Sequence, residues 1–198
     1  MLLHLRRSFT MALICLVVFG FAYAFAGTGV AQVLFKFQAN GSLTAHGSTL
    51  IGQNWTSPRF FHGRPDDFGP YAANAVTHTA GGDNPLVANG VNGGSGATNL
   101  GPRSQVLLSH TRALVAYWHS MGVNPTPDLV TTSGSGYDPD ISPQDALVQI
   151  PMVARATGFS ATVLRKLIAD QTHGAQFGFL GASYVNVLQL NEALAKLG

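Results

Sequence analysis

The side chains best suited to chemistry stand together in one short stretch, FFHGRPDD, over residues 60–67. His62, Arg64, Asp66 and Asp67 bring an imidazole, a guanidinium and two carboxylates into a chain of which only 10% is charged. Side chains of these types serve in general acid–base catalysis and in metal binding. The stretch is therefore the first candidate for an active site.

A structural role explains the same residues more simply. One of Phe60 and Phe61 is expected to enter the core from a short strand, while His62 and Arg64 face outward or pair with one of the two carboxylates that follow. The glycine and proline of HGRP turn the chain sharply away from that strand. From these residues alone, the structural interpretation is favoured over catalysis.

Motifs that mark the common enzyme classes are missing from the sequence. GGSGA at 93–97 and SGSGY at 133–137 both depart from the G-x-S-x-G spacing of a nucleophile elbow. The histidines form no H-E-x-x-H pair, and the phosphate-binding G-x-x-x-x-G-K-[ST] does not occur. These residues therefore point to no metal site and to no catalytic residues, although other arrangements of Ser, His and Asp stay open.

The clearest structural element in the sequence is an apolar N-terminal segment. No charged residue lies between Ser8 and Phe35, and FTMALICLVVFGFAYAFA fills residues 9–26. With the residues up to Ala31, this run reaches the roughly 20 helical residues that a bilayer core requires. We predict a transmembrane helix over residues 9–31.

The charges that flank this helix predict its orientation. Arg6 and Arg7 precede the apolar run, and Lys36 follows it. The denser positive cluster is expected to stay in the cytoplasm. This assigns residues 1–8 to the cytoplasm and residues 36–198 to an extracytoplasmic, periplasmic domain of a single-pass protein of the plasma (inner) membrane.

A cleaved signal peptide is the alternative interpretation of the same run. Ala24-Phe25-Ala26 has the small-x-small pattern of a cleavage site, and cleavage would release an exported soluble hydrolase or binding module. The apolar run is longer than the roughly 7–15 residues of a signal peptide's apolar region. The membrane anchor is therefore favoured.

Charge and cysteine usage limit what the outer domain does. Arg6 and Arg7 are two of the 11 basic residues, and the remaining 9 match the 9 acidic residues. The outer domain is therefore formally neutral, which argues against nucleic-acid binding. The single cysteine, Cys15, lies inside the apolar run, so packing without disulfides must hold the domain.

Apolar periodicity and capping signals predict a mixed α+β outer domain. STLIGQNW (48–55) and RFFHG (59–63) are short β-compatible runs, and the Gly- and Asn-rich residues 66–101 are expected to form a long surface loop. The elements expected after residue 100 are a helix over about 104–121 ended by Gly122, a strand over 128–133, a helix over about 143–157 capped by Ser142, a helix from Ser160 to about His173, a strand over 184–190 and a terminal helix over 191–197. The predicted fold class is α+β, with one N-terminal transmembrane helix and a single outer domain.

Four separated landmarks occur in one order along the chain. They are LIGQNWTSPRFFHGRP (50–65), GGSGATNLGP (93–102), DLVTTSGSGYDPDISPQDALVQIPMVARATG (128–158) and GFLGASYVNVLQLNEAL (178–194). Together with the single membrane helix, these motifs resemble the C subunits (KdpC) of Kdp potassium-transporting P-type ATPases. The resemblance runs through essentially the whole chain.

This resemblance implies an accessory, non-catalytic subunit of a high-affinity, ATP-driven potassium import complex. The implied partners are a channel-like potassium-binding subunit and an ATP-hydrolysing P-type subunit, whose assembly and stability the C subunit assists. The phosphorylated D-K-T-G-T motif of the pump subunits is absent from this chain. The outer domain is expected to sit against the extracytoplasmic mouth of the potassium-binding subunit.

The resemblance also implies particular site residues. Family C subunits are described as raising the pump subunit's affinity for ATP, with a nucleotide contact at the glutamine that matches Gln149. The predicted topology places Gln149 across the membrane from a cytoplasmic nucleotide domain, so ATP is a cofactor by resemblance alone. Candidate interface residues are His62 and Arg64, with a positioning role, and Gly20 and Ala24, whose small side chains allow close helix approach. An ordinary lipid-facing helix is the alternative for the last two.

Overall fold

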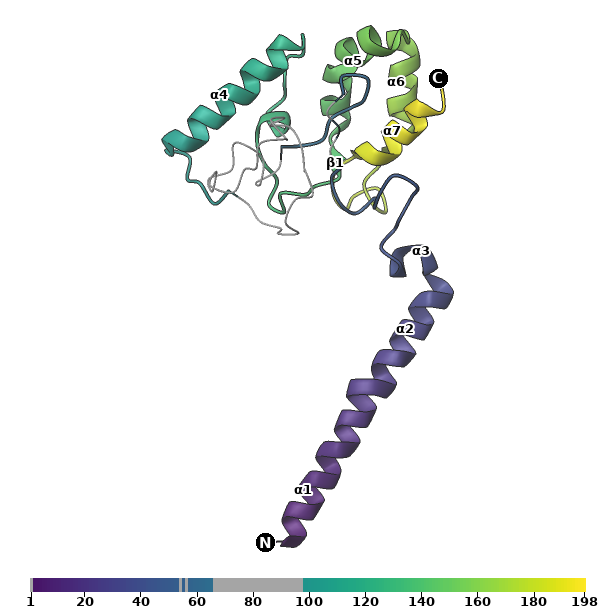
Figure 1. The fold of residues 1–198 in the computed structure, drawn as a ribbon. Helices are drawn as coiled ribbons and strands as arrows, with labels where there is room; N and C mark the ends of the chain where they lie inside the picture. Colours follow the sequence, from purple (N-terminus) through teal and green to yellow (C-terminus); the bar gives the residue numbers. More distant parts are fainter. Residues whose placement is uncertain (1, 54, 56, 66–97) are drawn as a thin grey trace. The chain divides into compact units, whose positions relative to one another are not determined.

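The described part of the chain has an α+β fold, built mainly from helices and one small antiparallel sheet. The computed structural model describes residues 2–53, 55, 57–65 and 98–198 (Figure 1). These residues belong to two units, Met1–Ala45 and His46–Gly198. Each unit is described by itself below.

The N-terminal unit is one long helix, as expected for an apolar run without proline. α1 (Leu2–Cys15) continues through a π-helical segment, η1 (Leu16–Ala22), into α2 (Tyr23–Leu34). An 18-residue window within these 33 residues has a mean hydropathy of 2.3, so the helix is long and apolar enough to cross a membrane. The helix extends beyond the predicted 9–31 at both ends, and the short α3 (Lys36–Ala39) follows it.

The first helix of the C-terminal unit confirms the sequence prediction closely. α4 (Gln105–Ser120) begins where the Ser104 hydroxyl accepts a hydrogen bond from the Leu107 amide at 3.4 Å. Its apolar stripe buries Leu114 and Trp118. Gly122 ends the helix at a φ of +74°, a left-handed conformation that glycine adopts without steric cost.

The strand predicted over 128–133 is wrong. A 3-10 turn, η3 (Asp128–Val130), occupies its first half. Leu129 and Val130 are both buried, although neighbouring residues of a strand point to opposite faces. Pro127 has a φ of −54° and opens this tight turn, which lets both apolar side chains reach the core.

The central helix is α5 (Pro143–Thr157), and it also confirms its prediction. The Ser142 hydroxyl accepts from the Asp145 amide at 3.1 Å, and the Asp145 carboxylate accepts from the Ser142 amide at 2.8 Å. This reciprocal capping box satisfies amides that the helix itself leaves unpaired. Gly158 ends the helix in the left-handed region, with a φ of +82°.

Two later boundaries differ from the prediction. α6 (Ala161–Asp170) ends before His173, because β2 (Thr172–His173) pairs with β3 (Tyr184–Asn186). The predicted strand over 184–190 stops at Asn186, whose side chain accepts from the Gln189 amide at 3.2 Å and caps α7 (Val187–Ala195).

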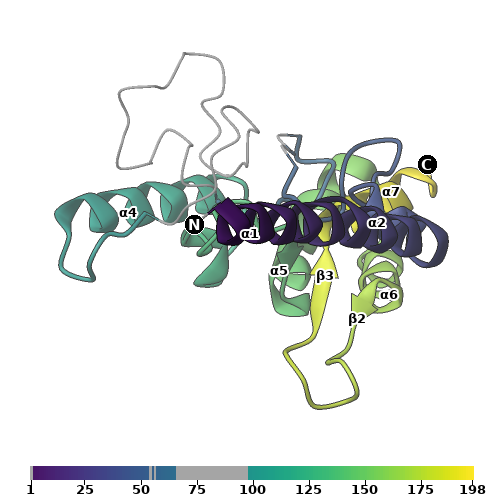
Figure 2. The same ribbon diagram turned by 90° about the horizontal axis from the view of Figure 1, so that it is seen from below.

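The sheet has three short antiparallel strands in the order β1-β3-β2. β1 (Asp140–Ile141) pairs with β3 so that Ile141 lies opposite Val185, and Thr172 of β2 lies opposite the same valine. Val185 is fully buried at the centre of this sheet. Figure 2 shows β3 beside β2, with the connecting hairpin extending beyond both strands.

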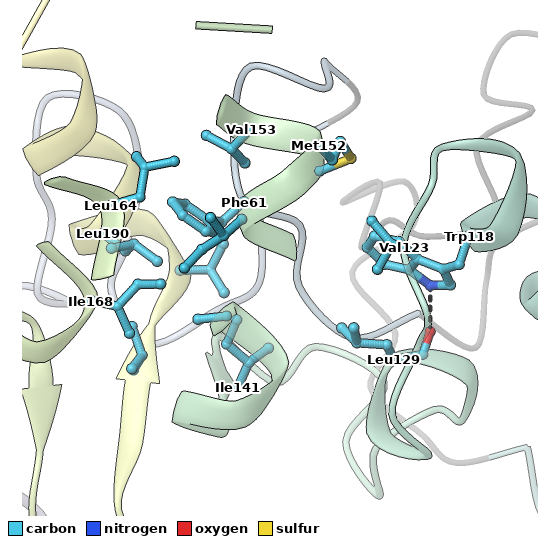
Figure 3. Close-up of a cluster of buried hydrophobic side chains, with 14 of the residues drawn as sticks. Phe61, Trp118, Val123, Leu129, Ile141, Met152, Val153, Leu164, Ile168 and Leu190 are labelled. Carbon is cyan, nitrogen blue, oxygen red and sulfur yellow. Dashed lines mark hydrogen bonds between the residues drawn. The ribbon is translucent and has the colours of Figure 1, made fainter. Parts of the chain in front are cut away.

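A hydrophobic cluster holds the C-terminal unit together. It unites side chains of α4, α5, α6, α7 and the sheet with Phe61, which belongs to none of these elements. In this cluster the Trp118 indole donates to the carbonyl of Leu129 at 3.0 Å (Figure 3). Its largest fully buried apolar side chains are Trp118, Phe61, Leu129, Leu164 and Leu190.

The β-compatible run RFFHG does not form a strand. Residues 57–60 make a turn in which the Phe60 amide donates to the Ser57 carbonyl at 3.0 Å, and residues 61–65 are irregular. Within the described part of 48–55 no strand forms either. Most of the predicted surface loop, residues 66–97 of 66–101, lies outside the described residues.

Candidate functional site

Two helices hold the backbone of Phe61 and His62 through buried side-chain amides. Asn191 of α7 accepts from the Phe61 amide and donates to the Phe61 carbonyl, both at 2.8 Å. Gln149 of α5 accepts from the His62 amide at 2.8 Å and donates to the His62 carbonyl at 3.0 Å. We call Gln149 and Asn191 the amide clamp. It supplies the hydrogen bonds that a neighbouring strand would otherwise supply.

The Gln149 side chain is fully buried, and its polar atoms are engaged. Its second amide hydrogen is donated to the carbonyl of Asp145 at 3.1 Å. An amide nitrogen has two hydrogens to donate, and both are used here. The nucleotide contact implied for Gln149 does not fit this arrangement, because a ligand would have to enter the core and displace these bonds.

Asn191 was not singled out from the sequence, although a signal for it exists. Val187, Leu190, Asn191 and Leu194 share one helical face at the spacing i, i+3, i+4 and i+7, and all four are buried. A buried amide needs a hydrogen-bond partner. An asparagine inside an apolar stripe therefore marks a backbone segment to be held, but its spacing does not tell which one.

His62 is buried, so the expectation that it faces outward is wrong. Phe61 and His62 are consecutive and both fully buried, because the segment is irregular and its side chains do not alternate. The His62 Nε2 donates to the carbonyl of Ser57 at 3.1 Å, and the imidazole lies 5.7 Å from the Trp118 ring. Burial lowers the pKa of His62 to about 4, against a weaker opposing effect of the Ser57 bond.

Arg64 binds the loop that follows η3. Its Nη2 donates to the carbonyls of Thr131 and Thr132 at 3.3 and 3.2 Å. The guanidinium also lies 3.9 Å from a carboxylate oxygen of Asp128 and 3.7 Å from one of Asp138. Arg64 thus ties residues 128–138 to the FHGRP segment.

The described side chains at this site support the fold of the domain. A neutral buried imidazole, an engaged guanidinium and two engaged amides offer no nucleophile with an adjacent base. Among the described residues no group of three or more His, Cys, Asp or Glu side chains is arranged to hold a metal ion. Asp66 and Asp67, the carboxylates of the opening motif, lie outside the described residues.

Gly20 and Ala24 lie in the N-terminal unit. Gly20 is part of the π-helical segment, and Ala24 lies in the first turn of α2. Both are exposed, and a Cβ added at Gly20 would meet only the Leu16 side chain, at 3.4 Å. The helix itself therefore does not require a glycine at this position.

Comparison with known proteins gives one consistent result. A family model described as "K+-transporting ATPase, c chain" (KdpC) matches residues 5–196. The chain is 43% identical over 205 residues to the potassium-transporting ATPase KdpC subunit of Methylobacterium nodulans, covering 100% of this chain and 98% of the relative. Subunits of the same description from Methylorubrum populi (41% identical; 100% and 98% covered) and Gloeobacter violaceus (42% identical; 88% and 86% covered) are also similar.

Proposed function

The chain belongs to the KdpC family, the c chains of potassium-transporting ATPases, and from this membership we propose that it is a non-catalytic accessory subunit. As a member of this family it is a subunit of a potassium transport complex. Our proposal is that it assists the assembly and stability of that complex, while a partner chain hydrolyses ATP. The observation that carries the proposal is the family match over residues 5–196.

Two features of the molecule support a non-catalytic role. The hydrogen bonds of the FHGRP segment are made within the chain, through the amide clamp and the Arg64 contacts, while Nδ1 of His62 and Nε of Arg64 are buried without a partner. The sequence also contains neither a phosphorylated D-K-T-G-T motif nor a nucleotide-binding glycine loop. In this proposal His62 and Arg64 position the domain's own loops.

The proposed partners are a channel-like potassium-binding subunit and a P-type ATPase subunit of the same complex. We propose that residues 9–31 span the membrane, that residues 1–8 are cytoplasmic and that residues 36–198 are periplasmic. The apolar helix and its flanking Arg6 and Arg7 support this topology. Gly20 and Ala24 are proposed to lie where the span meets a partner helix.

An effect on the partner's affinity for ATP is proposed to pass between subunits. The buried amide of Gln149 argues against a direct nucleotide contact by this side chain. Stabilising the partner state that binds ATP would change its affinity without such a contact, because any ligand or subunit that prefers one state shifts the equilibrium towards it.

Affinity purification from potassium-starved cells tests this function. A C-terminally tagged chain, extracted from membranes in mild detergent, should copurify with two larger chains that carry several membrane spans. Deleting the chain should leave those two partners unable to copurify with each other. A tagged chain that purifies alone, or a soluble mature form beginning near Gly27, would contradict the proposal.

A further inference from the structure

The hairpin between β2 and β3 exposes large apolar side chains at its tip. Phe177 is 87% exposed, Phe179 is 76% exposed and Leu180 is 49% exposed. Figure 2 shows that this connection extends well beyond the two strands. Two neighbouring phenylalanines with so little cover mark a contact surface more often than scattered apolar residues do.

The surroundings of these rings carry no formal charge. From Gln171 to Asn191 the sequence contains no Asp, Glu, Lys or Arg, and His173 is the only histidine. The tip, residues 174–183, contains only apolar and uncharged polar residues. The tip therefore has no charged group with which a charged partner surface could form an ion pair.

The tip is held in one shape by its own hydrogen bonds. Gln176 and Leu180 exchange backbone bonds of 2.8 and 2.9 Å, and the Phe179 amide donates to the Gln176 carbonyl at 3.2 Å. At the base of the hairpin the rings of His173 and Tyr184 stack with centroids 5.0 Å apart. Aromatic anchors on such a preorganised turn lose little conformational entropy when they bind.

The backbone of the turn is strained at Phe177. Phe177 has a φ of +53° and Gly178 a φ of +82°, so both lie in the left-handed region. Glycine or asparagine occupies this region at much lower steric cost than phenylalanine. A strained residue whose side chain is 87% exposed gains little within its own chain, which is a pattern typical of a functional position.

We propose that Phe177 and Phe179 insert into an uncharged, apolar pocket on another subunit of the potassium-transporting ATPase. This inference rests on the proposed function, which places such subunits beside this chain. A protein pocket is favoured over the lipid surface for two reasons. A fixed turn is needed to fit a pocket but not to enter lipid, and segments that bind lipid surfaces commonly carry Lys or Arg.

Replacing the two rings separates docking from folding. Phe177→Asn relaxes the left-handed backbone while it removes the ring, and Phe179→Ser removes the second ring. The double variant should unfold at a temperature no lower than that of the wild-type chain. Its retention of the larger subunits during detergent purification should nevertheless fall roughly tenfold or more, as expected for the loss of aromatic anchors.

Val163→Ser with Leu197→Ser is the matched control. Both residues are exposed, at 42% and 48%, and both lie outside the hairpin, so retention should not change. If the hairpin variant retains the larger subunits as well as wild type, this inference is overturned and the proposed function stands. If the wild-type chain itself retains none, the proposed function fails, and this inference fails with it.

Photocrosslinking identifies what the tip touches. The photoreactive p-benzoylphenylalanine replaces Phe177 in the full chain, and the complex is irradiated in native membranes before purification. An adduct with one of the larger subunits supports a protein pocket. Adducts with lipid alone would overturn it in favour of the bilayer surface, and the absence of any adduct would overturn it as well.

Discussion

At the scale of single residues, the amide clamp explains how an irregular segment is held inside a core. A buried backbone segment must find partners for its amide and carbonyl groups, and a sheet is the usual source. Here Gln149 of α5 and Asn191 of α7 provide these partners for the consecutive residues His62 and Phe61. The FHGRP landmark can therefore lie in the core without belonging to the sheet.

Gln149→Leu should destabilise the C-terminal unit without any nucleotide being present. The substitution leaves the buried amide and carbonyl of His62 unpaired, which costs about 3 kcal/mol of unfolding free energy. Gln144→Leu is the control, because Gln144 is exposed on the same helix. Thermal unfolding of the full chain in detergent measures both variants. Equal stability of Gln149→Leu and wild type would contradict the clamp.

Because buried His62 resists protonation, the unfolding free energy of the chain should fall in mildly acidic solution. Its pKa is about 4 in the folded protein and about 6.5 when unfolded, so the unfolded chain binds more protons between these values. Stability is therefore complete above about pH 6.5 and is lost as the pH falls towards 4. Between pH 7 and pH 5 the loss should be about 2 kcal/mol.

His62→Gln provides the comparison for this pH dependence. The variant should be less stable at pH 7, but its stability should change less between pH 7 and pH 5. Burial also lowers the pKa of His110, and the comparison with wild type removes that common contribution. Burial raises the pKa of Asp140, which acts in the opposite direction near pH 4, so unfolding is measured above pH 5. An unchanged slope would contradict a buried neutral His62.

At the scale of elements, α5 depends on a cap that also joins it to the preceding loop. The Asp145 carboxylate accepts from the Ser142 amide and from the Thr126 hydroxyl, and it is almost fully buried. The cap thus fixes the start of the helix that carries Gln149. Damage to this cap should loosen the amide clamp as well as the helix.

Ser142→Ala and Asp145→Ala should lower the unfolding free energy by different amounts. The first removes one capping bond and costs about 1 kcal/mol. The second costs about 2 kcal/mol, because two part-buried donors, the Ser142 amide and the Thr126 hydroxyl, lose their acceptor. Ser109→Ala, at an exposed position inside α4, should change stability very little. Equal effects of all three in thermal unfolding would contradict the role of the cap.

Local signals in the sequence predicted the elements that depend on neighbouring residues. Ser142, Pro143 and Asp145 predict the start of α5, because the capping contacts of a helix start join residues that are close in the sequence. The predictions for 59–63 and 184–190 departed from the structure for two different reasons. Phe61 finds its hydrogen-bond partner at Asn191, 130 residues away, and sequence periodicity carries no information about such a distant partner. The strand predicted over 184–190 ends at Asn186, which caps a helix inside a run that also suits a strand.

The candidate site was predictable in some of its residues, without Asn191, and its geometry was not predictable. The sequence identified His62, Arg64 and Gln149, and the last came from family resemblance alone. Nothing in the spacing indicated that Gln149 lies against His62, because 87 residues separate them. Because of this separation, the sequence could not show that Gln149, implied to contact a nucleotide, is a core residue in the folded domain.

Gly20 of the apolar helix is predicted to pack against a partner helix. Gly20→Leu should weaken the copurification of the larger subunits if this position faces a partner helix, because a bulky side chain prevents close approach. Gly29→Leu is the control on the same helix, and an added Cβ there meets no atom within 4 Å. Equal retention by the two variants would favour a lipid-facing Gly20.

At the scale of the whole molecule, the chain joins one apolar helix to a domain for which we propose a partner-binding hairpin. Gln149 and Asn191 use their buried amides to hold the domain's own backbone, and the most exposed aromatic side chains among its described residues lie at a hydrogen-bonded hairpin tip. This division suits a subunit whose contribution is contact with other chains. Such a subunit acts by favouring one state of its partners.

The orientation of the molecule is the last prediction, and its single cysteine makes the test direct. In a Cys15→Ser background, Leu197→Cys places one thiol at an exposed position near the C-terminus, and His4→Cys places one before the apolar run. A membrane-impermeant maleimide should label the Leu197→Cys variant in intact spheroplasts, because the positive flank keeps the N-terminus inside. The His4→Cys variant should react only after the membrane is opened. The reverse pattern would invert the topology, and a labelled soluble chain that lacks its N-terminus would establish cleavage.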